Sequence, residues 1–216
     1  MGFRNRLFIN RYVSFLTVTL TRSTTRLITA PLLIACGADP VHPAPYVQPL
    51  NNRLTDYGVD TSLRLAHFLS QILAKSDRMR TTEEYASGAA YEGRRDLGNT
   101  QPGDGVRFKG RGLIQITGRA NYAALVKAFG LDYIAHPTWL EQPDDAVHSA
   151  LLYWDSRKLN GWAEKDNVLA ISQIINLGNI PRPGSKRQIP NGLSARKALL
   201  AKCKTALGVG AAVPVT

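Results

Sequence analysis

The spacing of apolar residues predicts a mainly helical chain. Between residues 61 and 76, the stretch TSLRLAHFLSQILAKS places leucine and isoleucine three and four positions apart, which is the period of a helix with one buried face. Thr61 or Ser62 can cap its amino terminus. Phe68, Gln71 and Lys75 share an adjacent stripe, because residues three and four apart are neighbours on a helix surface. The buried stripe is predicted to consist of Leu65, Leu69, Ile72 and Leu73.

Four more segments have a helical pattern: 119–130, 143–157, 167–176 and 194–208. Gly130 is placed to end the first, and a proline with two acids is typical of the beginning of the second. Ser194 and Gly208 are predicted to cap the last. The inner face of segment 143–157 is predicted to be Ala146, Ala150, Leu151 and Trp154.

Proline and glycine predict the connections between these helices. Residues 41–49 carry three prolines and are predicted to be a connector. Residues 91–112 contain six glycines and form a long loop, which inside a compact domain usually serves function. Residues 113–117, LIQIT, are predicted to be a very short strand. The predicted fold class is mainly α, with long loops and at most a very short β element.

The amino-terminal region has two interpretations. Its first 38 residues hold five arginines and no acid. Residues 27–36 are either a first helix with Leu27, Leu32, Leu33 and Ala35 inside, or the apolar part of a secretion signal ending in a lipoprotein-like cysteine, Cys36. We therefore divide the chain into a basic extension or signal-like segment (1–26), one domain (27–208) and a tail (209–216).

Composition excludes several classes of protein. The 216 residues, 44% of them hydrophobic, suit one globular domain. No run of eighteen apolar residues predicts a membrane span. The net charge of +11 favours anionic partners, but no motif predicts nucleic-acid binding. Neither the two cysteines nor the four histidines have metal-ligand spacing, so we expect no metal and no cofactor.

Three glutamates flank the long loop: Glu83, Glu84 and Glu92. Cleavage of a glycosidic bond generally needs two carboxyl groups across a cleft, one to protonate the leaving oxygen and one to activate water or attack. Acids at a helix end and in the following loop could face each other in this way. Exposed glutamates are more often simply solvated.

Four stretches together resemble glycoside hydrolase family 19: AHFLSQI, TTEEYASGAAYEGRRDLGNTQPGDG, FKGRGLIQITGRANY and IIN. The similarity is to its bacterial and phage lysozyme-like (endolysin) branch, related to plant-type chitinases, and covers most of residues 27–208. It implies a bilobal, lysozyme-like helical domain that cuts β-1,4 links in chitin or peptidoglycan, with inversion and without metal. We then expect a monomer acting at the bacterial cell wall, in the periplasm, outside the cell or after release from the host cytoplasm during phage lysis.

The resemblance also implies roles for single residues. The family's general acid is the glutamate of a His-Glu-Ser stretch, where this chain has Ala74-Lys75-Ser76. Glu84 matches the general base, and Thr117 matches the hydroxyl residue that positions water. The implied substrate-binding and supporting residues are Glu92, which is a less favoured candidate for the base, Arg111, Gln115, Asn121, Tyr122 and Asn176.

Lys75 therefore stands where the acid should be. A lysine ammonium has an ordinary pKa of about 10.4, far above that of a working glutamic acid, and general-acid catalysis contributes roughly 10²–10⁴-fold. Lys75 could also pair with Glu84. Two hypotheses remain: a cell-wall glycan hydrolase impaired at Lys75, or a non-catalytic protein that binds peptidoglycan or chitin.

Overall fold

The computed structural model describes residues 27–185 and 188–210, and this part of the chain is helical and contains no sheet. The predicted segment 1–26 and residues 211–216 of the predicted tail lie outside the described residues. The α-helices are α1 (Ala30–Ala35), α2 (Ala44–Arg53), α3 (Ser62–Lys75), α4 (Asp104–Arg107), α5 (Arg119–Phe129), α6 (Pro143–Ser156), α7 (Leu159–Glu164), α8 (Val168–Leu177) and α9 (Leu193–Leu207).

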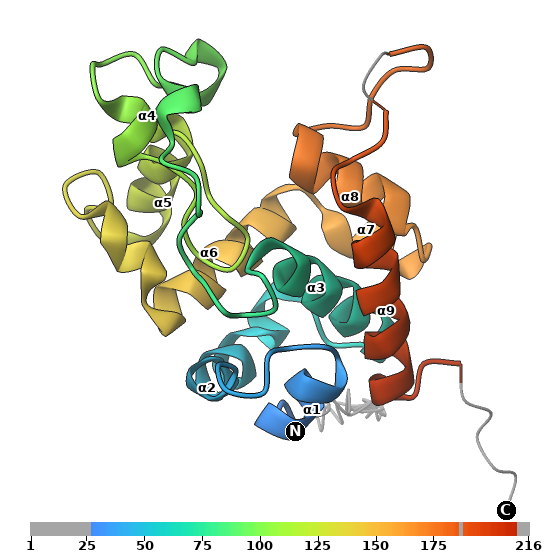
Figure 1. The fold of residues 1–216 in the computed structure, drawn as a ribbon. Helices are drawn as coiled ribbons and strands as arrows, with labels where there is room; N and C mark the ends of the chain where they lie inside the picture. The colour runs from blue at the N-terminus through green and yellow to red at the C-terminus, as the bar shows by residue number, and fades with distance from the viewer. Residues whose placement is uncertain (1–26, 186–187, 211–216) are drawn as a thin grey trace, which may run out of the picture.

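Helix α3 lies at the centre of the molecule, with α9 alongside it (Figure 1). The lobe that contains α4 and α5 rises on one side of α3, and α8 with the following loop rises on the other (Figure 1). Short 3₁₀ turns lie at Thr55–Tyr57, Ala89–Tyr91, Arg95–Leu97 and Pro137–Glu141. The mainly helical fold class is therefore confirmed.

The predicted inner faces of α3 and α6 are buried, since all eight side chains are at most 2% exposed. The Thr61 hydroxyl accepts a hydrogen bond from the backbone N–H of Arg64, which is the predicted amino-terminal cap. Phe68 of α3 meets Trp154 of α6 edge to face at 5.4 Å between ring centroids. Aromatic pairs of this geometry stabilise the fold beyond the burial of their area. Helices α3 and α6 are therefore joined by a well-packed core.

The connector predicted at residues 41–49 is wrong, because α2 begins at Ala44. Pro45 is in the first turn of α2, where the missing N–H would have no partner in any case. Pro49 is inside the helix and buried. Its ring packs in the interior, and this burial offsets the hydrogen bond that proline cannot make.

The strand predicted at residues 113–117 is also wrong. Residues 112–115 form a turn, closed by isolated bridges from Arg111 to Glu83 and to Ile116. Gln115 has a φ of +63°, a left-handed conformation that no strand contains. The apolar residues at 113, 114 and 116 are buried because the turn lies against the core.

Smaller corrections concern helix ends. Leu27 precedes α1 and is 69% exposed, and Ala35 is exposed as well, so neither lies inside as predicted. Ile28, Leu33 and Cys36 are buried. Helix α9 is capped by Gly192 instead of Ser194, although Gly208 ends it as predicted. Helix α7 had no prediction, since its six residues are too few to show a periodic pattern.

An unusual turn follows α3. Asp77, Arg78 and Met79 all have φ between +47° and +69°. Residues other than glycine in this region store strain that the surroundings must balance. Met79 is 1% exposed and its N–H bonds to the buried Ser76 hydroxyl, while the Arg78 guanidinium donates to the carbonyl of Gly37. The turn reverses the chain so that residues 81–85 pass beside the end of α3.

Across residues 27–185 and 188–210, no helix is both long and apolar enough to cross a membrane. The same residues contain no cluster of three histidine, cysteine or acidic side chains that could hold a metal ion.

Candidate active site

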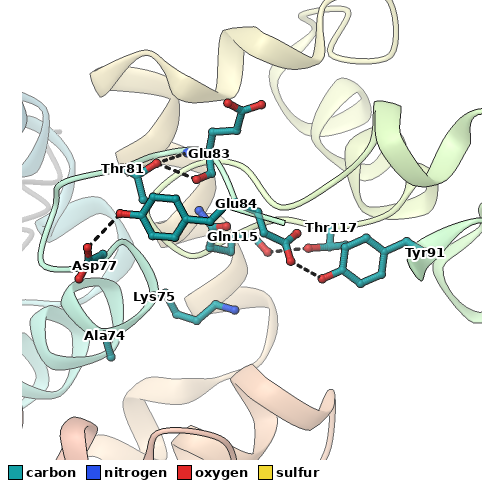
Figure 2. Close-up of a pocket in the computed structure, with 10 residues that line it drawn as sticks. Ala74, Lys75, Asp77, Thr81, Glu83, Glu84, Tyr91, Gln115 and Thr117 are labelled. Carbon is teal, nitrogen blue, oxygen red and sulfur yellow. Dashed lines mark hydrogen bonds between the residues drawn. The ribbon is translucent and has the colours of Figure 1, made fainter. Parts of the chain in front are cut away.

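Two hollows meet at the end of α3 and share Lys75, Tyr91, Gln115 and Thr117. The first has a volume of about 390 Å³ and the second about 500 Å³. A third hollow continues past Asn176 along the loop after α8. Because the second hollow shares lining residues with both of the others, together they form one open groove. The first is also lined by Ala74, Asp77, Thr81, Glu83, Glu84 and Tyr85, as Figure 2 illustrates.

Lys75 is the last residue of α3, and its side chain extends toward the part of the groove that holds Glu84 and Tyr91 (Figure 2). Burial, together with the positive charge of Arg196, lowers the pKa of the Lys75 amine to about 8, although Glu84 opposes the shift. Among the described residues, none forms a hydrogen bond or ion pair with this amine. Lys75 is therefore a partly desolvated cation without a fixed acceptor.

Glu84 is held on the opposite wall by a precise set of hydrogen bonds. Its Oε1 accepts from the Tyr91 hydroxyl at 2.7 Å, and its Oε2 accepts from the backbone N–H of Gly110 at 3.0 Å. Its own N–H donates to the Gly110 carbonyl at 2.9 Å. Burial and the bond to Glu84 raise the pKa of Tyr91 to about 12, so Tyr91 remains a hydrogen-bond donor at neutral pH.

Lys75 and Glu84, for which the sequence left an ion pair open, form none within the part of the chain that the structure describes. The carboxylate is bound by Tyr91 and the Gly110 amide instead. Gly110 permits the arrangement because a Cβ there would lie 2.7 Å from Gln115 Oε1 and 3.1 Å from Glu84 Oε2. The two charged groups therefore face a common space without touching.

Gln115 and Thr117 form the wall between the two hollows. The Gln115 amide donates to the carbonyl of Gly112, and the Thr117 hydroxyl donates to the carbonyl of Gln115 at 3.0 Å. A hydroxyl with its proton engaged in this way still has lone pairs to accept a hydrogen bond from a water. Lys75, Glu84 and Thr117, which are distant in the sequence, thus line one groove.

Of the other predicted binding residues, Asn121 and Asn176 line the second hollow. Asn121 donates to the Thr117 carbonyl, and the Asn176 side-chain oxygen accepts from the N–H of Asn191. Both side chains are partly exposed and fixed at one end. Each therefore keeps polar atoms available to a ligand in the groove.

Glu92, Arg111 and Tyr122 do not line any of the three hollows. The Glu92 carboxylate accepts from the N–H groups of Gly103 and Gly105 and clamps the loop. Arg111 is buried, pairs with Glu141 at 2.8 Å and donates to the Tyr122 hydroxyl. These three residues therefore support the groove wall without lining the groove.

Four residues that line or support the groove were not predicted from the sequence: Tyr91, Arg94, Arg157 and Arg196. Arg196 had the strongest available signal, because it interrupts the inner face of α9. It is 3% exposed and donates to the side-chain oxygen of Gln71 and the carbonyl of Asn191. Burial lowers the pKa of its guanidinium to about 10.

Comparison with known proteins gives a consistent result. No family model matches the sequence. A "glycosyl hydrolase family 19 domain-containing protein" of Haemophilus influenzae is 38% identical over 95 residues, which are 44% of this chain and 46% of that protein. The match therefore spans less than half the length of that relative.

Solved structures of family 19 chitinases share the fold over most of the chain. Chitinase C from Streptomyces griseus superposes with a TM-score of 0.65 at 19% identity, over 84% of this chain and 77% of that one. A class IV chitinase from Zea mays gives 0.57 at 17% identity over 90% and 88%, and a bacterial family 19 chitinase gives 0.62 at 18% over 85% and 96%. The resemblance predicted from the sequence is thus confirmed: the chain is similar in sequence to a family 19 protein over part of its length and has the fold of family 19 chitinases.

Proposed function

We propose that this chain is by descent a cell-wall glycan hydrolase of the endolysin or chitinase type, in which Lys75 replaces the general acid. It binds β-1,4-linked glycan as a monomer and cleaves it very slowly or not at all. The observation that carries the proposal is the position of Lys75 at the end of α3, lining the same groove as Glu84 and Thr117.

An inverting hydrolase needs one group to protonate the leaving oxygen and another to activate water on the opposite face of the sugar. Glu84 suits the second role, because two hydrogen bonds hold its carboxylate in the groove. Thr117 suits the positioning of the water, because its oxygen can accept a hydrogen bond at the same wall. These contacts support the assignment of Glu84 as general base and of Thr117 as the water-positioning residue.

The other side lacks a suitable proton donor. Even with its pKa lowered to about 8, Lys75 is a much weaker acid than a glutamic acid, whose ordinary pKa is about 4.3. Its positive charge also opposes the oxocarbenium-like charge that develops on the sugar in the transition state. Both effects act against cleavage, while the rest of the groove still favours binding.

The decisive experiment restores the acid. We expect the Ala74→His, Lys75→Glu double variant to cleave chitohexaose or purified peptidoglycan roughly 10²–10⁴-fold faster than the unmodified chain, with inversion at the anomeric carbon as observed by NMR. Adding Glu84→Gln to the double variant should abolish this gain and serves as its control.

The second candidate function is a non-catalytic glycan-binding protein, favoured by the unpaired amine in an otherwise intact groove. The same experiment separates the two. A double variant that binds glycan but remains inert would support the binding protein and refute the impaired hydrolase. Rapid cleavage by the unmodified chain would refute both proposals about Lys75.

A further inference from the structure

The part of the groove lined by Lys75, here called its floor, has a second cation, the buried Arg196, behind it. Gln71 and Lys75 are four residues apart on α3 and therefore lie on the same side of the helix. Arg196 of α9 donates a hydrogen bond to Gln71 and is close enough to lower the pKa of the Lys75 amine by its charge. Positive charge thus enters the floor from two helices.

Arg196 has no carboxylate partner among the described residues. Its acceptors are the side-chain amide oxygen of Gln71 and the backbone carbonyl of Asn191, and both are neutral. Its guanidinium is buried, so water screens its charge weakly. The field of Arg196 therefore reaches Lys75 and the space above it.

The acids of the groove do not neutralise this floor. Glu84 is engaged by the Tyr91 hydroxyl and the Gly110 amide. Glu83 pairs with Lys109 at 2.9 Å, and Asp77 accepts from the Tyr85 hydroxyl at 2.9 Å. Each carboxylate already has a donor of its own, which leaves the Lys75 ammonium as a donor that faces open space.

We propose that Lys75, backed by Arg196, makes the floor of the groove a binding site for a carboxylate carried by the glycan. This inference rests on the proposed function and narrows its substrate class. An ammonium has three donors and no acceptor, and a neutral chitin chain would desolvate it without supplying a negative charge. A glycan whose sugars bear free ether-linked carboxylic acids supplies that charge and completes the pair.

The test compares three tetrasaccharides by calorimetric titration at pH 7. One alternates N-acetylglucosamine with its carboxylated (muramic acid) counterpart, the second is the same compound with each carboxylate converted to an amide, and the third is chitotetraose. We expect the unmodified chain to bind the acid at least about tenfold more tightly than the amide, because an ion pair in a partly buried site is sensitive to loss of one partner.

Two variants locate the effect. Lys75→Gln should bring the ratio of the two affinities close to one. Lys197→Gln removes the same charge from an exposed position of α9 and should leave the ratio unchanged.

A preference for the acid that persists in Lys75→Gln would overturn the carboxylate site, and so would equal affinity of the unmodified chain for acid and amide. The proposed function would remain valid after either result, provided that the unmodified chain binds the glycans. Failure of the unmodified chain to bind any of the three would overturn both.

Discussion

Lys75 ends α3 with its amine partly buried in the groove, and the energy of this placement depends on pH. The folded chain holds the Lys75 pKa at about 8, against an ordinary value of 10.5. Between these values the unfolded chain keeps a proton that the folded chain has released, so stability rises with pH across this window. Below pH 8 both states are protonated and folding bears the full cost of burying the charge, about 3 kcal/mol by the size of the shift.

We therefore expect Lys75→Met to stabilise the protein near pH 6.5 by up to about 3 kcal/mol and to have little effect above pH 10.5. Urea unfolding of both proteins at the two pH values measures the difference. Lys197→Met, at an exposed position of α9, is the matched control and should change stability equally little at either pH. A gain from Lys75→Met that is the same at both pH values would contradict the buried-charge explanation.

Among the structural elements, the long loop between Glu84 and α5 determines the shape of one wall. The hydrogen bonds that hold this loop in place centre on Asp104, the first residue of α4, which is 1% exposed. The carboxylate accepts from the N–H groups of Thr100 and Gln101 and from the Arg119 guanidinium. The bond from Arg119 lowers the pKa of Asp104, so its contribution is present above pH 4 and is lost as pH falls through the lowered value.

We expect Asp104→Asn to destabilise the protein by about 1–3 kcal/mol, because Asp104 is buried and the substitution removes the charge that the partly exposed Arg119 bonds to. Hydrogen exchange should show the largest loss of protection in residues 91–118, and the affinity for glycan should fall with it. Asp96→Asn breaks an exposed pair with Arg94 in the same loop and should leave exchange unchanged. Equal effects of the two substitutions would mean that Asp104 does not fasten the loop.

For the molecule as a whole, the first and last described helices pack together. Leu33 and Cys36 are completely buried, and the Cys203 thiol of α9 points at the Cys36 carbonyl at 3.7 Å. A Cβ on Gly37 would lie 2.7 Å from the Leu199 side chain, which shows how closely the two segments approach. We propose that residues 27–36 are part of the folded domain, which favours the helix over the secretion-signal interpretation.

This proposal predicts that Leu33→Ala lowers the free energy of unfolding by about 2–5 kcal/mol, the usual cost of a leucine cavity in a core. Leu27→Ala, only six positions earlier but exposed, should have almost no effect. Thermal unfolding of the two variants makes the comparison. If Leu33→Ala were neutral, α1 would not contribute to the core.

The sequence by itself determined the helices whose apolar faces repeat regularly, together with several of their ends. The stripes of α3 and α6 and the caps Thr61, Gly130 and Gly208 are local features, since each depends on residues within a few positions. The motifs also identified Lys75, Glu84 and Thr117 as candidates, because the resemblance to family 19 is carried by short contiguous stretches.

Only the tertiary structure decided what these residues touch. Pro49 stays helical because its ring is buried. Residues 112–115 turn because Arg111 bridges to Ile116 across the turn and to Glu83 in another segment. Glu84 bonds to Tyr91 and Gly110 instead of Lys75, and Glu92 faces the loop instead of the groove. Such choices depend on distances between segments far apart in the sequence, and hydrogen bonding and burial fix them only when the chain has folded.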